Sequence, residues 1–248
     1  FRRVLFRSRW RFWRDVELSV DAYVNVLRRS EPELLEFSIT RDKIPIYSVE
    51  AAFMATPSVG YIKVSRFSAT TMKEFREKLT ELKTAGMKDL ILDLQGNGGG
   101  YLRTAIEMAD EFLGDRKLVV YTEGRTAPRE DTYATKDGLF EKGRLVVLVD
   151  EGSASASEIV SGAIQDLDRG VIMGQRTYGK GLVQQTRDLF YNSKLKVTVA
   201  KYYIPSGRCI QKLDYSHRDS TGKVEEVKEA AIAEFKRCLR APDRQARD

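Results

Sequence analysis

The stretch "DLILDLQGNGGG" (residues 89–100) is where the fold can first be read. Leucine and isoleucine dominate its first half, which is typical of a strand that is buried on both faces of a sheet. A glycine-rich loop follows, and residues 101–114 then carry apolar side chains at helical spacing. A buried strand, a glycine turn and a helix in this order form the repeating unit of an α/β sheet.

The glycine loop by itself has two interpretations. Consecutive glycines let the backbone turn its N–H groups toward a ligand, but they also make an ordinary flexible turn. The glycine spacing matches neither the phosphate-binding loop nor the dinucleotide-binding fingerprint. The loop therefore marks a candidate site at the end of a strand without identifying a ligand.

The same alternation of strand-like and helix-like segments continues along most of the chain. A polar loop or β-excursion is expected at residues 124–143. The expected strands are 61–67, 89–94, 117–123, 144–150, 170–174 and 194–205, and the expected helices are 71–86, 101–114 and 155–167. We therefore predict an α/β core over residues 61–215 with a mostly parallel sheet, and a C-terminal tail over residues 216–248.

The residues before this core divide into three parts. Two runs, 22–29 and 34–46, alternate apolar and polar side chains around a short polar turn, which predicts a β-hairpin. Because a hairpin alone is marginally stable, residues 15–46 are expected to be part of a small β domain. Residues 47–60 are expected to be a connector, and residues 1–14, with six arginines, a disordered or non-native end.

Composition and charge narrow the class of protein. The chain has 248 residues, 42% of them hydrophobic, which suits a globular domain with a sizeable core. The net charge is +6, and because the arginine run is best explained as a disordered or non-native end, no nucleic-acid partner is predicted. No stretch reaches the roughly 18 apolar residues of a membrane span. Cys209 and Cys238 lack metal-ligand spacing, so neither a metal nor a cofactor is expected.

A second strand-to-helix junction, "VDEGSASASE" (residues 149–158), places three serines at alternate positions. Ser155 and Glu158 have the spacing of a capping box, so Ser155 is either only a helix N-cap or also a nucleophile. A helix N-terminus offers free N–H groups and a positive dipole end, both of which stabilise an oxyanion. The one histidine, His217, lies in a polar segment and is expected to be solvated, which gives a Ser-His-Asp triad little support.

The segment "QRTYGKGLVQQ" (residues 175–185) offers another base, Lys180. A lysine acts as a base only when neutral, and burial away from carboxylates must then lower its pKa from about 10.4 to about 7–8. Gly179 and Gly181 would allow close backbone approach, and Gln184 would orient the amine without adding charge. Taken alone, Lys180 is better explained as a surface residue in a turn, and it is the combination with the serine motif that favours a base.

Together these motifs resemble the carboxyl-terminal processing, or tail-specific, serine peptidases. The resemblance covers about residues 34–215 and rests on "GYIKVSRF" (60–67), "LILDLQGNGGG" (90–100), "GSASASEIVSGAIQD" (152–166) and "GQRTYGKGLVQ" (174–184). It implies an α/β core of crotonase-like or Clp-peptidase-like type beside a PDZ domain. The hairpin at residues 15–46 resembles only the last part of such a domain, so its carboxylate-binding loop is expected to be missing.

The resemblance also implies the site residues, the substrate and the cellular location. The implied site residues are Ser155 as nucleophile, Lys180 as base, Gln184 as supporting amide, and the backbone N–H groups of Ala156 and of Gly98 or Gly99 as oxyanion donors. The substrate would be a protein or peptide with an apolar C-terminus, and the enzyme would be bacterial and extracytoplasmic, in the periplasm or cell envelope. Membrane association of the full-length protein and assembly into a homo-oligomer stay open.

Two other functions are compatible with the same residues. A crotonase-like acyl-CoA enzyme would use the oxyanion loop but would leave the Ser155–Lys180 pair idle. A non-catalytic module would read C-terminal peptides through its β domain. Acyl-CoA turnover, peptide cleavage, and peptide binding without cleavage are the three observations that separate these hypotheses.

Overall fold

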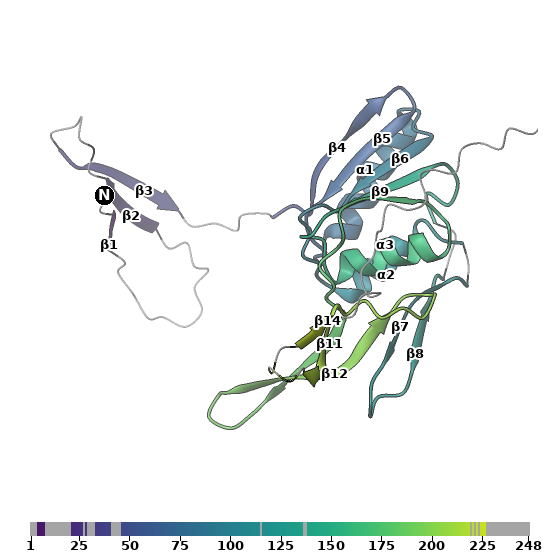
Figure 1. Ribbon diagram of the computed structural model, residues 1–248. Coiled ribbons are helices and arrows are strands. Elements are labelled where there is room, and N and C mark those ends of the chain that lie inside the picture. Colours follow the sequence, from purple (N-terminus) through teal and green to yellow (C-terminus); the bar gives the residue numbers. More distant parts are fainter. Residues whose placement is uncertain are drawn as a thin grey trace, which may run out of the picture. The chain divides into compact units, whose positions relative to one another are not determined.

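The chain folds as two units, Phe1–Ile46 and Tyr47–Asp248, which are described here one at a time (Figure 1). The computed structural model describes residues 4–7, 21–26, 28, 33–40, 46–114, 116–135, 138–218, 220, 222 and 224–226. In the described part, no helix is both long and apolar enough to cross a membrane.

The first unit contains a three-stranded antiparallel sheet with strand order β1-β2-β3. Its strands are β1 (Val4–Arg7), β2 (Asp21–Val26) and β3 (Leu35–Thr40). The predicted hairpin corresponds to β2 and β3, which pair from Asp21 with Thr40 to Val26 with Leu35. Within the end that was expected to be disordered or non-native, Val4–Arg7 forms β1, which pairs antiparallel with β2, so disorder does not hold for these four residues and a non-native origin stays a prediction. The rest of residues 1–14 lie outside the described residues.

The second unit is built on a five-stranded sheet with strand order β10-β9-β6-β5-β4. Its strands are β4 (Val49–Thr56), β5 (Val59–Val64), β6 (Asp89–Asp93), β9 (Leu145–Val149) and β10 (Val171–Gly174). The last four run parallel to one another, and only β4 is antiparallel to its neighbour, so the prediction of a mostly parallel sheet is confirmed.

The connector predicted at residues 47–60 is wrong, because β4 and the start of β5 occupy it. The sequence "VEAAFMAT" of β4 contains several residues with low strand propensity and no strict alternation. Pairing with β5 makes this segment a strand, and β5 is a neighbour that local propensity cannot reveal. Sequence reasoning therefore missed the edge strand of the main sheet.

Three helices bury their apolar faces in one core. They are α1 (Thr71–Thr84), α2 (Leu102–Asp110) and α3 (Ala156–Asp166). The buried helix residues include Met72, Phe75, Leu79, Leu82, Ala105, Met108, Ala109, Ile159, Val160, Ala163 and Ile164. Leu90 and Leu92 of β6 lie in the same core and are at most 1% exposed, as the apolar run at residues 89–94 predicted.

A second, antiparallel sheet has the strand order β11-β12-β7-β8. Its strands are β7 (Leu118–Glu123), β8 (Glu130–Tyr133), β11 (Leu182–Asp188) and β12 (Lys194–Tyr203). The runs 117–123 and 194–205 were expected in the parallel sheet, and that placement is wrong. An apolar run indicates a strand but not the sheet that it joins. Figure 1 shows α2 and α3 between the two sheets, and both helices contact β7.

The predicted boundary between core and tail, at residue 215, falls inside a strand. A two-stranded antiparallel sheet pairs β13 (Leu213–Arg218) with β14 (Val224–Glu226). His217 lies in β13, but its side chain is outside the described part of the chain, so its expected solvation stays a prediction. Residues 227–248, with Cys238, are also outside the described residues.

Candidate active site

Three loops that sequence reasoning singled out meet at one edge of the main sheet. They follow β6, β9 and β10, which are neighbours in the sheet and run parallel. Parallel strands end at the same edge, which is where α/β proteins place their ligand sites. The glycine loop, the serine turn and the lysine loop are therefore brought together by sheet topology, although they span residues 94–181.

Backbone and side-chain hydrogen bonds join the glycine loop to the serine turn. One carboxylate oxygen of Asp150 accepts from the N–H groups of Gly96 (2.8 Å) and Gly152 (2.9 Å). The Ala154 N–H donates to the carbonyl of Asn97 over 3.0 Å. The two loops consequently form one rigid surface beside the start of α3.

The structure distinguishes the three serines. Ser153 and Ser157 are fully buried, and their hydroxyls donate to the carbonyls of Leu94 (2.8 Å) and Asn97 (2.9 Å). Ser155, by contrast, is partly exposed. Ser153 and Ser157 therefore hold the glycine loop in place, and Ser155 is the serine that a substrate can reach.

Ser155 also has an unusual backbone conformation. It is the N-cap residue of α3 with φ +56° and ψ −108°, in a region that L-residues with a side chain rarely adopt. Such conformations cost about 1–3 kcal/mol and are found preferentially at functional sites. The predicted capping pair is present, because the Ser155 N–H donates to the Glu158 carboxylate over 2.7 Å. Capping and nucleophilic attack are compatible, since in a capping box the Ser155 hydroxyl oxygen only accepts a hydrogen bond and its own proton stays available to a base.

The glycine loop approaches this turn closely at Gly99. Its φ is +96°, and a Cβ at this position would lie 2.7 Å from the Ala154 carbonyl oxygen and 2.9 Å from the Ser155 Cβ. The Gly99 N–H donates to the Asn97 side-chain oxygen over 2.9 Å. Of the two expected oxyanion donors in this loop, Gly99 is thus already engaged. Ala156 is the first residue of α3, where an N–H has no acceptor within the helix.

Asn97 is a structural residue of the site that sequence reasoning missed. It is fully buried, and its side-chain amide donates to the carbonyl of Val64 over 2.8 Å while its side-chain oxygen accepts from Gly99. Its own carbonyl accepts from the Ser157 hydroxyl. The available signal was an asparagine inside a run of glycines. Its side-chain amide can hydrogen-bond the backbone, and a buried amide without such partners is costly, so Asn97 could have been expected to hold the loop.

Glu158 connects the nucleophile turn to the lysine loop. One carboxylate oxygen accepts from the N–H groups of Ser155 (2.7 Å) and Lys180 (2.9 Å). The other accepts from the Gly179 N–H (2.6 Å) and the Thr177 hydroxyl (2.8 Å). Burial raises the pKa of Glu158, and the four hydrogen bonds oppose that rise. Because one oxygen holds both amides, the backbones of Ser155 and Lys180 lie close together.

Lys180 and Gln184 line one cavity of about 690 Å³, together with residues of β13. Both side chains are exposed, so the burial that a neutral lysine needs is absent from this structure. In the part of the chain that the structure describes, no hydrogen bond joins the Ser155 hydroxyl to the Lys180 amine. The structure thus brings the two backbones together without forming the predicted side-chain pair.

The glycines that flank Lys180 have the close neighbours that were expected. A Cβ at Gly179 would collide with the side chain of Lys212, and one at Gly181 would collide with the backbone of Gln211. The Gln211 side-chain oxygen accepts from the Gly181 N–H over 2.9 Å. The segment before β13 thus packs directly on the lysine loop and forms one wall of the cavity.

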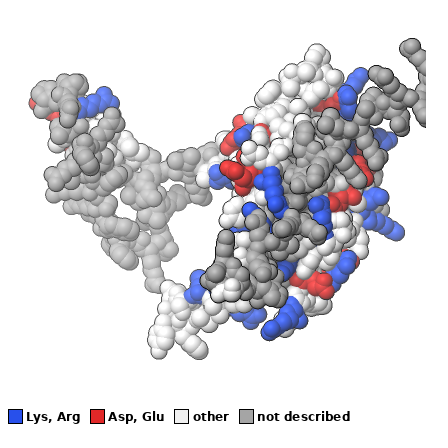
Figure 2. Space-filling view, in the orientation of Figure 1, with Lys and Arg blue, Asp and Glu red and all other residues white. Residues whose placement is uncertain are grey.

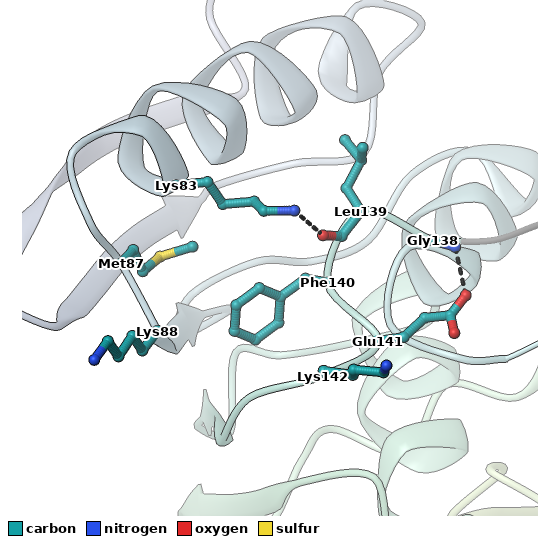
Figure 3. Close-up of a pocket in the computed structure, with 8 residues that line it drawn as sticks. All are labelled: Lys83, Met87, Lys88, Gly138, Leu139, Phe140, Glu141 and Lys142. Atoms are coloured by element: carbon teal, nitrogen blue, oxygen red, sulfur yellow. Dashed lines mark hydrogen bonds between the residues drawn. The ribbon is translucent and has the colours of Figure 1, made fainter.

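A smaller cavity of about 330 Å³ lies where β6 and β9 begin, at the opposite edge of the main sheet (Figure 3). Its polar groups stabilise the surrounding loop: Lys83 donates to the Leu139 carbonyl over 2.7 Å, and Glu141 accepts from the Gly138 N–H over 2.6 Å. None of the predicted site residues lines this cavity. Among the described residues, no cluster of histidine, cysteine or carboxylate side chains is suited to hold a metal ion.

The Glu158→Gln substitution tests the connection between the loops. A glutamine accepts hydrogen bonds at one oxygen only, so its NH₂ group would face two donors that lose their acceptor, either the N–H groups of Ser155 and Lys180 or the Gly179 N–H and the Thr177 hydroxyl. Each unsatisfied buried donor costs about 1–3 kcal/mol, and we expect a loss of about 2–5 kcal/mol in the free energy of unfolding, measured with urea. Glu77→Gln on the exposed face of α1 is the control and should change it by about 0.5 kcal/mol or less. Equal losses in the two variants would contradict this role of Glu158.

Gly99→Ala tests the close approach of the glycine loop. The new Cβ would meet the Ala154 carbonyl, and alanine disfavours a φ of +96°, so we expect a loss of about 1–3 kcal/mol in unfolding free energy. Gly98→Ala is the matched control, because a Cβ there meets no atom within 4 Å. A Gly99→Ala variant as stable as Gly98→Ala would show that the loop does not contact the serine turn in solution.

A protein-family model and several curated proteins match most of this chain. The model of peptidase family S41 matches residues 58–216. The carboxyl-terminal-processing protease of Synechocystis sp. is 40% identical over 181 residues, which are 72% of this chain and 42% of the relative. The carboxy-terminal processing protease CtpA of Bacillus subtilis is 36% identical over 186 residues, which are 75% of this chain and 40% of the relative.

Solved structures give the same result. The photosystem II D1 C-terminal processing protease is 32% identical with a TM-score of 0.62, over 78% of this chain and 53% of that one. A putative S41 protease from Bacteroides fragilis, at 15% identity and a TM-score of 0.58, supports the fold alone. The chain spans about two fifths of the length of the two curated relatives. Its fold is the Clp-peptidase-like α/β core, and the chain belongs to peptidase family S41, among the carboxyl-terminal processing serine proteases.

Proposed function

We propose that the intact protein is a serine endopeptidase that cleaves protein substrates near their C-termini, with Ser155 as the nucleophile. The observation that carries this proposal is the difference among the three serines. Ser153 and Ser157 are buried and hydrogen-bonded within the site, whereas Ser155 is reachable and lies at a helix N-terminus. The names of the relatives favour peptide cleavage over the acyl-CoA chemistry and the non-catalytic binding that the sequence left open.

In the proposed mechanism, Lys180 takes the proton of the Ser155 hydroxyl as its oxygen attacks the scissile carbonyl carbon. The peptide C–N bond then breaks as that proton passes to the leaving amine, and an acyl-enzyme remains. Water attacks the ester and releases the second product. The negative charge on the carbonyl oxygen would be stabilised by the N–H groups of Ala156 and Gly98 and by the positive end of the α3 dipole. We assign the loop donor to Gly98, because the Gly99 N–H is bonded to Asn97.

Lys180 is the proposed base, and Gln184 is proposed to orient its amine. Exclusion of water favours the neutral form of an amine, so we propose that a bound peptide fills the cavity and excludes water when the lysine acts. The Glu158 carboxylate is bonded to backbone N–H groups of both loops, so its four acceptor positions already have partners. It is therefore proposed to position the lysine loop rather than to take part in proton transfer.

The remaining features of the proposal come from the family. A peptide with an apolar C-terminus is the proposed substrate, and residues 15–46 are proposed to be the last part of a PDZ domain. We also propose a bacterial, extracytoplasmic location. These features are those of full-length family members, and the chain spans about two fifths of the length of the two curated relatives.

Ser155→Ala should abolish cleavage while the fold is kept. We expect turnover of an apolar-tailed protein by the full-length enzyme to fall by about 10³- to 10⁶-fold, because the nucleophile is gone. Ser153→Ala removes a buried hydroxyl of the same turn and is the matched control. Its main effect should be a loss of about 1–3 kcal/mol in unfolding free energy, with turnover of the folded fraction retained. A Ser155→Ala enzyme that still cleaves would remove Ser155 from the role of nucleophile.

Lys180→Arg should be nearly inactive even though its charge is conserved. A guanidinium cannot give up its proton at usable pH, so we expect turnover to fall by about 10²- to 10⁴-fold, the range for a lost general base. Lys212→Arg makes the same change in the wall of the same cavity and should retain most of the turnover. Comparable turnover by Lys180→Arg and the unchanged enzyme, measured from pH 6 to pH 10, would assign the base to another group.

A further inference from the structure

The outer half of the β11–β12 hairpin is exposed along both strands. Every residue from Gln184 to Lys196 is exposed, including four with large apolar side chains. Phe190 is 88% exposed and Tyr191 is 102% exposed, and both lie at the turn. Leu189 and Leu195 are about half exposed beside them. Isolated apolar residues on a surface are common, but a group of four at one end of a projecting ribbon marks an interaction site.

The turn holds an aromatic side chain at the very tip at some conformational cost. Tyr191 and Asn192 have φ values of +58° and +57°, and the Ser193 N–H donates to the Phe190 carbonyl over 3.3 Å. This is a type I′ turn, in which Asn-Gly is the favoured central pair. A bulky residue such as tyrosine is a clear outlier at positive φ. The turn therefore places tyrosine where glycine or asparagine would be less strained.

Basic side chains follow the apolar tip on both strands. Arg187 lies on β11, and Lys194 and Lys196 lie on β12, against a single acidic residue, Asp188, which pairs with Lys194. Figure 2 shows the outer end of the hairpin as mostly white, with basic atoms beside it. Along the hairpin, apolar side chains therefore occupy the tip and basic side chains lie directly behind them.

We propose that this tip inserts into the surface of a membrane that contains anionic phospholipids. A strand advances about 3.3 Å per residue, and only Asn192 and Ser193 separate Tyr191 from the start of β12, so Lys194 lies at most about 10 Å behind Tyr191. Interfacial elements bury their apolar groups about 5–10 Å deep, at the boundary between headgroups and acyl chains. Insertion to that depth would place Phe190 and Tyr191 in the layer that aromatic side chains prefer, and Arg187 and Lys194 beside the lipid phosphates.

The size of the tip favours a lipid surface over a protein partner. A specific protein interface of ordinary size buries about 800 Å² on each partner, over about 20 residues or more. The end of a two-stranded ribbon offers a point of contact with no surrounding rim. A lipid bilayer can bind so small an element, because its molecules rearrange around the inserted side chains. Since β11 begins two residues after Lys180 and advances about 20 Å to Asp188, a docked hairpin would hold the cavity that Lys180 lines about 20 Å from the lipid phosphates.

Vesicle flotation of the full chain tests the proposal. The probes are vesicles of phosphatidylcholine with 30% phosphatidylglycerol, and vesicles of phosphatidylcholine alone, at about 50 mM salt. We expect the chain to float with the anionic vesicles and the Phe190→Ser/Tyr191→Ser variant to partition at least about tenfold less. Lys194→Glu/Lys196→Glu should also partition at least about tenfold less, since each basic residue near an anionic surface contributes about fivefold.

Controls separate the tip from general charge effects. Lys73→Glu/Lys117→Glu changes the net charge by the same amount at exposed positions outside the hairpin, and it should alter partition by less than about twofold. This comparison matters because the arginines at residues 2–14 also attract anionic lipid. All the substituted residues are exposed, so circular dichroism and the thermal midpoint should match those of the unchanged chain, and a variant that fails this check is replaced by the single substitution Tyr191→Ser.

Three results would overturn the proposal. One is flotation of the tip variants equal to that of the unchanged chain. Another is a loss in the Lys73/Lys117 control as large as in the hairpin variants. The third is an unchanged chain that does not float with the anionic vesicles; self-association in sedimentation that depends on Phe190 and Tyr191 would then show that the tip is a protein contact. None of these outcomes depends on peptidase activity.

Discussion

The candidate site depends on one buried carboxylate. Glu158 receives hydrogen bonds from Ser155 on one side and from Thr177, Gly179 and Lys180 on the other, so a single side chain sets the distance between two loops. Burying a carboxylate is costly, which is why its pKa rises, and only full hydrogen bonding makes the arrangement stable. The cost of burying Glu158 is offset only when all four donors bond to its carboxylate. The loops are therefore held in the one geometry that allows this, and the site is preorganised.

Parallel strands supply the framework on which this carboxylate acts. β6, β9 and β10 end at the same edge of the sheet, and each is followed by one loop of the site. The glycine loop is then held by buried polar groups, chiefly Asn97 and the hydroxyls of Ser153 and Ser157. The serine that carries the proposed chemistry is thus surrounded by residues of similar chemistry whose function is structural. The capping-box spacing and the family motif single out Ser155 in the sequence, and burial separates it from the other two serines in the structure.

The antiparallel sheet β11-β12-β7-β8 extends from the interior of the unit to an exposed hairpin. At its inner end, β12 packs with β7, and Ala200 and Ile204 lie in the interior. At its outer end, β11 and β12 leave the body of the unit and become a ribbon exposed along its length. One hairpin therefore connects the cavity that holds Lys180 to an apolar tip, and both depend on the pairing of the same two strands.

The sequence by itself determined the α/β class, the main helices and the positions of the candidate nucleophile and base, because apolar periodicity and short motifs are local. It did not reveal β4, whose alanine-rich strand forms only by pairing with β5, nor the sheet to which β7 and β12 belong. Only the tertiary structure decided which serine is reachable, which glycine N–H is engaged, and that Lys180 is exposed. Those properties depend on contacts between residues distant in the chain, such as the hydrogen bonds from Ser157 to Asn97 and from Lys180 to Glu158. A local sequence pattern does not encode burial or hydrogen-bond partners across such separations.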